Sequence, residues 1–185
     1  MDYDEAIDWL YGTQLFGIKL GLNGPRRMFE ELDLFAALEG RTIFHVAGTN
    51  GKGSVCAMID SICRAAGKSC GLFTSPHLVC FRERIQVDGS MIEEDEVAKI
   101  LTQLRDRVAG WETHPTFFEL ALTLAVKYFC QQDVGTLVME TGMGGRLDAT
   151  NVLPASVSVI TSISASPAPR RSASWRRSTR RRWSI

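Results

Sequence analysis

A glycine-rich stretch with one lysine, residues 47–54 (Ala-Gly-Thr-Asn-Gly-Lys-Gly-Ser), is the strongest candidate for chemistry in this sequence. A short β-rich run, 42–46, precedes it, and apolar residues at helical spacing follow it. Glycines allow a backbone to approach an anion closely, and the first turn of a helix offers free N–H groups and a positive dipole end. Lys52 adds a point charge suited to the β- and γ-phosphates of a nucleotide. The stretch is therefore a candidate phosphate-binding loop.

The loop departs from the common phosphate-loop pattern, G-x-x-x-x-G-K-[ST], at two positions. Val46 stands where the first glycine belongs, and Gly53 separates Lys52 from Ser54. A tight turn between a strand and a helix is the alternative. The loop by itself leaves both interpretations open.

The elements around this loop alternate between strands and helices. Apolar residues at helical spacing predict helices over 2–16, 25–38, 55–66, 97–108 and 117–130. Apolar, β-rich runs predict strands over 42–46, 70–73, 136–140 and 157–163, and a hairpin over 84–92 that turns at Asp88-Gly89. Such alternation predicts an α/β fold with a mainly parallel sheet covered by helices on both faces.

Composition excludes several classes of protein. The 185 residues are 45% hydrophobic and 23% charged, which favours a soluble globular domain. No apolar run reaches the roughly 20 residues that span a bilayer, and the acidic N-terminus lacks the basic start of a secretory signal, so we expect a cytoplasmic protein with no membrane partner. The five cysteines form no CxxC pair, which argues against a zinc site and a disulfide framework.

The charge distribution divides the chain near residue 164. Residues 1–164 carry 14 basic and 21 acidic residues, whereas residues 165–185 carry seven arginines and no acid. We expect an N-terminal globular unit over 1–164 and an Arg/Ser/Pro-rich tail over 165–185. Three interpretations of the tail stay open: a nucleic-acid-binding arm, a disordered segment without function, and the product of a shifted reading frame.

Five ordered blocks then suggest a family. His-Val-Ala-Gly-Thr-Asn-Gly-Lys-Gly-Ser (45–54), Gly-Leu-Phe-Thr-Ser-Pro-His-Leu (71–78), Arg-Glu-Arg-Ile (82–85), Phe-Phe-Glu (117–119) and Met-Glu-Thr-Gly-Met-Gly-Gly-Arg-Leu-Asp-Ala-Thr-Asn (139–151) occur in this order. Together they resemble the bifunctional dihydrofolate synthase/folylpolyglutamate synthases, which are Mur-type ATP-dependent amide ligases. The resemblance implies the central domain of a Mur ligase, with a P-loop-type ATP site.

The resemblance also implies a reaction that uses ATP and Mg²⁺. The γ-phosphate is transferred to a carboxylate of dihydropteroate or of a folate glutamate tail, and the amine of L-glutamate then attacks the acyl phosphate. A carboxylate is a poor electrophile, so ATP supplies the leaving group while the protein supplies positioning and charge neutralisation. The expected partners are these small molecules, in a monomer that does not bind nucleic acid.

Site residues are carried over from the matching blocks. The resemblance places the ATP phosphates at Thr49, Asn50, Gly51, Lys52, Gly53 and Ser54, with Lys52 as the catalytic residue. It places Mg²⁺ at Ser75 and Glu140. It places the pterin-bearing substrate at Thr116, Phe117, Phe118, Glu119, Leu147, Asp148 and Ala149.

Physical arguments accompany some of these assignments. A hydroxyl oxygen is a hard ligand suited to Mg²⁺, and Glu140 ends a strand at the carboxyl edge of the sheet, where ligands bind. The alternative for Glu140 is a solvated strand end. Phe117 and Phe118 are suited to packing on a flat ring, or to the core. His77 is either a site residue or structural, and His45, inside a strand, is expected to be structural.

The resemblance stops after the run 157–163. There the family continues with an Asp-His pair, whose histidine binds a second Mg²⁺, and with a segment that carries a modified lysine; neither appears here. We therefore expect an incomplete N-terminal domain that is inactive by itself. Two alternatives stay open: another Mur-type ligase, against which the blocks 74–78 and 117–119 argue, and a nucleotide-binding module without ligase chemistry.

Overall fold

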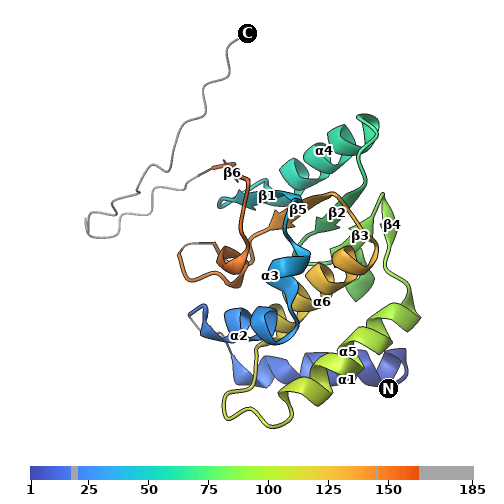
Figure 1. The fold of residues 1–185 in the computed structure, drawn as a ribbon, viewed down its shortest axis with the longest axis vertical. Coiled ribbons are helices and arrows are strands. Elements are labelled where there is room, and N and C mark those ends of the chain that lie inside the picture. The colour runs from blue at the N-terminus through green and yellow to red at the C-terminus, as the bar shows by residue number, and fades with distance from the viewer. Residues whose placement is uncertain (18–20, 145, 163–185) are drawn as a thin grey trace, which may run out of the picture.

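A six-stranded sheet forms the centre of the computed structural model, which describes residues 1–17, 21–144 and 146–162 (Figure 1). The spatial order of the strands is β4-β3-β2-β5-β1-β6. Their bounds are β1 Thr42–Ala47, β2 Cys70–Phe73, β3 Ile85–Val87, β4 Ser90–Met91, β5 Thr136–Glu140 and β6 Val157–Ile160. Strands β2, β5, β1 and β6 are mutually parallel, whereas β3 and β4 form the antiparallel hairpin predicted around Asp88-Gly89. The prediction of a mainly parallel α/β sheet is confirmed.

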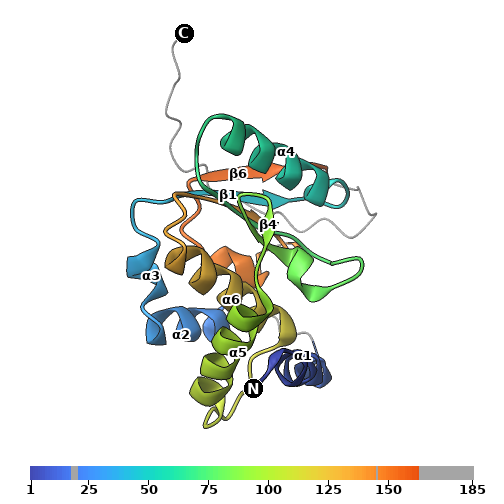
Figure 2. The ribbon, with the colours of Figure 1, turned by 90° about the vertical axis from the view of Figure 1, so that its right-hand side faces the viewer.

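Helices cover both faces of the sheet. Their bounds are α1 Tyr3–Gly12, α2 Asn23–Glu31, α3 Leu34–Ala37, α4 Lys52–Ala65, α5 Glu94–Val108 and α6 Phe117–Gln131, with short 3₁₀ helices η1 Thr13–Phe16, η2 Phe81–Arg84 and η3 Ala149–Val152. Helix α4 lies alone on one face, and α6 lies on the other with α1, α2, α3 and α5 (Figure 2). The sheet is therefore the middle of three layers.

Successive side chains of β5 pack alternately on the two faces of the sheet. Val138 packs in the cluster under α4, together with Cys56 of that helix, whereas its neighbours Leu137 and Met139 pack in the larger cluster against α6. Successive side chains of a strand point to opposite faces, so a continuous apolar run is needed where both faces are covered. This burial explains why the segment 136–140 lacks the polar alternation of a half-exposed strand.

The N-terminal helices are shorter than predicted. The helix expected over 2–16 is α-helical only to Gly12 and continues as η1. The helix expected over 25–38 is interrupted at Asp33, whose φ of 55° is left-handed. A residue in that conformation ends an α-helix, so the segment divides into α2 and α3.

Helix α4 packs on the sheet with one stripe of its residues. Ile62, whose spacing contributed to the prediction of this helix, lies outside that stripe and is 68% exposed. The residues packed against the sheet include Cys56, Ile59 and Cys63, which are spaced by three and four positions. All five cysteines of the chain are free thiols.

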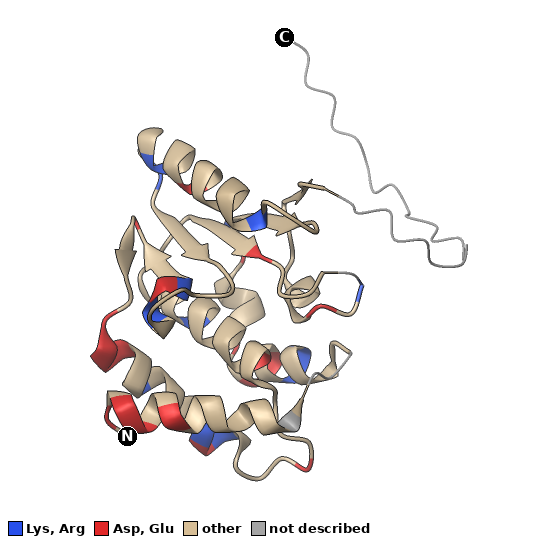
Figure 3. Ribbon diagram, turned by 180° about the vertical axis from the view of Figure 1, so that it is seen from behind, with Lys and Arg blue, Asp and Glu red and all other residues tan. Residues whose placement is uncertain are grey.

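Helix ends carry the charges that stabilise them. Acidic residues gather in the first turns of α1 and α5 (Figure 3), where Asp4, Glu5, Glu94, Asp95 and Glu96 lie. Carboxylates there interact favourably with the positive end of the helix dipole. None of the helices in the described ranges combines the length and the apolar composition that crossing a membrane requires.

The last predicted strand lies partly outside the described residues. Strand β6 ends at Ile160, and the final residue of the predicted run, Ile163, is not described. The tail 165–185 also lies outside the described residues. The division into units over 1–164 and 165–185 therefore stays a prediction.

Candidate nucleotide and substrate site

The glycine-rich loop joins β1 to α4 and is held by the end of β6. The N–H of Thr49 donates to the carbonyl of Ser162 at 2.9 Å, and Thr161 Oγ1 donates to the carbonyl of Asn50 at 2.7 Å. A Cβ at Gly48 would overlap Thr161 Oγ1, and the φ of Gly48 is 148°, so this close approach requires glycine. The loop is thus fixed against the two residues that follow β6.

The loop ends at the N-terminus of a long helix. Gly51, with a φ of 77°, is the N-cap of α4, and Lys52 is the first of its 14 residues. The first N–H groups of a helix have no partner within that helix, and they lie at the positive end of its dipole. The strand–loop–helix context that a phosphate-binding loop requires is therefore present.

Lys52 faces a buried carboxylate. The Nζ of Lys52 lies 4.0 Å from Oε1 of Glu140, the last residue of β5, and Glu140 is only 4% exposed. Oε2 of Glu140 accepts the backbone N–H of Ser75 at 2.9 Å, and a Cβ at Gly53 would lie 3.6 Å from the same oxygen. Glu140 is therefore not a solvated strand end but joins the phosphate-loop region to the residue that follows β2.

The electrostatics of Glu140 are set by two opposing effects. Burial raises the pKa of the Glu140 carboxyl, whereas the Ser75 N–H and the positive charges of Lys52 and Arg84 act in the opposite direction. The net direction is upward. A buried carboxylate whose partners do not fully offset its desolvation is suited to accept a further positive charge.

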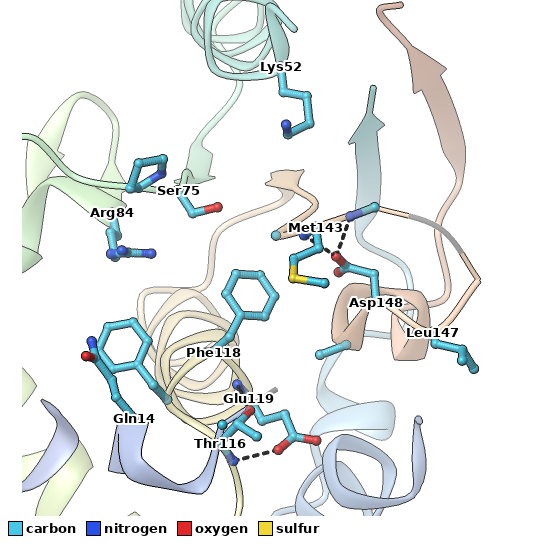
Figure 4. Close-up of a pocket in the computed structure, with 16 residues that line it drawn as sticks. Gln14, Lys52, Ser75, Arg84, Thr116, Phe118, Glu119, Met143, Leu147 and Asp148 are labelled. Atoms are coloured by element: carbon cyan, nitrogen blue, oxygen red, sulfur yellow. Dashed lines mark hydrogen bonds between the residues drawn. The ribbon is translucent and has the colours of Figure 1, made fainter. Parts of the chain in front are cut away.

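A cavity of about 540 Å³ opens beside these residues (Figure 4). Many of the residues predicted at the site line this cavity, and they come from four separate parts of the chain. The predicted residues that line it are Lys52, Ser75, Thr116, Phe117, Phe118, Glu119, Leu147, Asp148 and Ala149. Residues 49–51, 53 and 54 and Glu140 do not line the cavity but belong to the adjoining loop and strand end. Tertiary structure thus brings the predicted residues into one region.

Phe117 and Phe118 pack against the hydrophobic core and also line the cavity. Phe118 lies 5.8 Å from the ring of Phe73, and Phe117 stacks on Tyr11 with ring centroids 5.4 Å apart. Both rings are half-buried and both line the cavity. Both rings therefore pack against neighbouring aromatic residues and face the cavity, while their contact with a flat ring of the substrate stays a prediction.

Two polar residues expected at the substrate form a capping box. Thr116 Oγ1 accepts the N–H of Glu119 at 3.3 Å, and Glu119 Oε2 accepts the N–H of Thr116 at 2.7 Å. This reciprocal pair satisfies two orphan donors at the start of α6. The spacing Thr-x-x-Glu carries this signal in the sequence. Their role as substrate ligands stays a prediction.

Asp148 organises its own loop with both carboxylate oxygens. Oδ2 accepts the N–H groups of Met143 and Gly144 at 2.8 and 2.9 Å, and Oδ1 accepts the N–H and Oγ1 of Thr150. Thr150 Oγ1 in turn lies 2.7 Å from His45 Nε2. These bonds explain the residue type at 148 and agree with a structural His45. Substrate binding by Asp148 stays a prediction.

The sequence did not single out several lining residues. Gln14, Met143 and Arg84 line the cavity, yet none was assigned a role. Arg84 belongs to the block 82–85, which was noted for its resemblance alone. Gln14 follows α1 in η1, and no sequence pattern connected it with a site 38 positions away in the chain.

The fold and the loop define an α/β protein with a P-loop-type strand–loop–helix unit.

No family model matches the chain. The dihydrofolate synthase/folylpolyglutamate synthase of Bacillus subtilis is 39% identical over 166 residues, which are 87% of this chain and 38% of that protein. The solved folylpolyglutamate synthase of Thermotoga maritima has a TM-score of 0.78 at 35% identity, over 86% of this chain and 38% of that chain.

A second solved relative carries ligands. The bifunctional folylpolyglutamate synthase/dihydrofolate synthase from Yersinia pestis, complexed with AMPPNP and a Mn ion, has a TM-score of 0.76 at 33% identity, over 86% of this chain and 38% of that chain. This chain belongs to the dihydrofolate synthase/folylpolyglutamate synthase family and corresponds to the N-terminal part of its members. It spans 38% of the length of the Bacillus subtilis protein. The resemblance found in the sequence is confirmed.

Proposed function

We propose that this chain binds ATP and Mg²⁺ as the nucleotide-binding part of a ligase that adds L-glutamate to dihydropteroate or to a folate glutamate tail. One observation carries the proposal. Lys52 at the start of α4 and Ser75 after β2 line an aromatic-lined cavity, and both lie against Glu140 at the end of β5. The solved Yersinia pestis relative is complexed with AMPPNP and a Mn ion, which supports nucleotide and metal binding by this chain.

The residues present fit Mg²⁺ bound together with a nucleotide. Within the described residues, no group of three or more His, Cys, Asp or Glu residues could hold a metal ion by itself. Ser75 Oγ and the Glu140 carboxylate offer two hard oxygen ligands, and phosphate oxygens and water complete the six that Mg²⁺ prefers. When bound, the ion offsets negative charge on the phosphates.

The chain's own residues neutralise charge and position the substrates. Lys52 and the first amides of α4 face the phosphates, where they offset negative charge during phosphoryl transfer. Phe117 and Phe118 offer their faces to a flat ring system in the cavity. Lys52 lines the same cavity, so a carboxylate attached to such a ring can lie next to the loop. This arrangement is what ATP-dependent activation of a carboxylate needs.

Nucleotide binding is tested by calorimetric titration of the 185-residue chain with AMPPNP and Mg²⁺. The Lys52→Ala variant should bind at least about tenfold more weakly, because a charge-assisted contact to phosphate is lost. Lys68→Ala is the matched control, since Lys68 is an exposed lysine beyond the other end of α4. Equal affinity in wild type and Lys52→Ala would contradict the assignment of Lys52.

Ligation is tested in a fusion with the remaining part of the Bacillus subtilis relative, because this chain spans 38% of that protein. Amide formation from L-glutamate with dihydropteroate or tetrahydrofolate is the expected result. Turnover of a different acceptor in place of these two would indicate another Mur-type ligase. The expectations of a cytoplasmic monomer that does not bind nucleic acid stay predictions.

A further inference from the structure

Arg84 is a nearly buried cation that forms no ion pair with any described residue, although the charge of Glu140 acts on it at longer range. It is the last residue of η2, lines the cavity and is only 7% exposed. Among the described residues, neither Nη atom has a hydrogen bond or an ion pair, and only Nε has a partner. Arg82, two positions earlier, instead pairs with the carboxylates of Glu93 and Glu94. The Nη atoms are not among the fully buried polar atoms without a partner, and Arg84 lines the cavity, so both are open to a partner supplied from outside the chain.

Three elements hold the guanidinium in place. Arg84 Nε donates to His77 Nδ1 at 2.7 Å, and Tyr11 Oη lies 3.0 Å from His77 Nε2. Since arginine can only donate, His77 Nδ1 is the acceptor, and the ring proton lies on Nε2, which donates to Tyr11. The Arg84 guanidinium carbon also lies 5.3 Å from the ring centroid of Phe117, within the range of a cation–π contact. The orientation of Arg84 is thus fixed from α1, from the segment after β2 and from α6.

The free edge of Arg84 faces the space that the acceptor would occupy. Figure 4 shows Arg84 and Ser75 on the left, with Phe118 below them and Lys52 above them. With Nε engaged by His77, the two Nη atoms remain to donate in parallel. Parallel N–H donors match the two oxygens of a carboxylate, a geometry that lysine does not offer.

We propose that Arg84 binds the carboxylate of the acceptor substrate and holds it next to the phosphate-binding loop, with His77 and Tyr11 as positioning residues. The inference rests on the proposed function, because it names the group by which that site recognises its acceptor. Glu140 lies at the same edge of the sheet and would repel a substrate carboxylate in the absence of this counter-charge. Arg84 is therefore a determinant of specificity for anionic acceptors.

The test compares pteroate with its uncharged carboxamide as ligands of the full 185-residue chain, in the presence of Mg²⁺ and AMPPNP. Fluorescence titration of wild type should give a preference for pteroate of about tenfold to a hundredfold. In Arg84→Gln this preference should fall to about one, while the affinity for the carboxamide changes little. Arg84→Lys should keep part of the preference. Arg82→Gln is the matched control and should keep all of it.

Several outcomes would overturn the inference. If Arg84→Gln weakens both ligands equally, Arg84 acts by supporting the cavity and not by binding the carboxylate. If wild type binds the two ligands equally, or binds AMPPNP but neither of them, no carboxylate subsite exists. Absence of AMPPNP binding as well would contradict the proposed function itself, so the two failures are distinguishable. The titration is repeated with tetrahydrofolate, whose carboxylates are on its glutamate, whereas the carboxylate of pteroate is on the benzoyl ring. The comparison shows which of the two carboxylates Arg84 binds.

Discussion

Glu140 accepts the backbone N–H of Ser75 at 2.9 Å, and this one contact joins the carboxyl ends of the neighbouring parallel strands β2 and β5. The same carboxylate lies 4.0 Å from Lys52 at the start of α4. Three segments separated by more than 20 residues thus meet at a single buried acid. Charge at this position should therefore affect both the stability of the fold and the binding of cations.

Replacement of Glu140 by glutamine should change these two properties in opposite directions. Glu140→Gln keeps an oxygen that can accept the Ser75 N–H, but it removes a charge whose burial raises the pKa of the group. The melting temperature at pH 7 should rise slightly, because the desolvation of the Glu140 charge is not fully offset by Ser75, Lys52 and Arg84. The Mg²⁺ concentration needed for half-maximal AMPPNP binding should rise about tenfold or more.

The matched control for this change is Glu39→Gln, since Glu39 is exposed and precedes β1, at the opposite end of that strand from the loop. It should alter neither the melting temperature nor the Mg²⁺ titration. An unchanged Mg²⁺ titration in Glu140→Gln would remove Glu140 from the metal site.

Substitution of Gly142 should narrow the cavity. A Cβ there would lie 2.8 Å from the ring of Phe118, so Gly142→Ala must displace that ring. Overpacking of this kind costs about 1–3 kcal/mol, and the displaced ring should also weaken pteroate binding. Gly110→Ala is the matched control, because a Cβ at Gly110 meets nothing within 4 Å. Urea unfolding and fluorescence titration measure the two effects, and unchanged pteroate affinity in Gly142→Ala would show that Phe118 does not contact the ligand.

Stability should depend on pH through His45. Burial lowers the pKa of His45 below its ordinary value of 6.5, although the charge of Asp148 acts in the opposite direction. Between the two values the unfolded chain binds more protons than the folded chain, so the neutral ring stabilises the fold above pH 6.5. This contribution is lost as the pH falls below 6.5 toward the pKa of the folded state.

The measurement is the melting temperature between pH 5 and 8 for wild type and His45→Gln. Wild type should lose stability more steeply than the variant below about pH 6.5. Parallel curves for the two proteins would mean that the pKa of His45 is the same in the folded and unfolded chains.

Short-range patterns in the sequence were sufficient for the individual elements of the site. The run 42–46, the glycines of 47–54 and the apolar spacing beyond them predicted a strand, a loop and a helix, which are β1, the loop and α4. Each depends on backbone periodicity and on residues next to one another in the chain. The break at Asp33 was missed because apolar spacing continues across it while one backbone angle does not.

Periodicity along the chain did not show which residues meet; the family resemblance suggested it, and the tertiary structure gives the physical reason. Lys52, Ser75 and Glu140 come together because β2, β5 and β1 are neighbours in the sheet, an order that differs from their order in the chain. The unpaired state of Arg84 depends on which side chains surround it after folding, and nothing in the block 82–85 distinguishes it from Arg82. Sequence patterns report periodicity along the chain, whereas proximity across the sheet and burial of charge arise only when distant segments pack together.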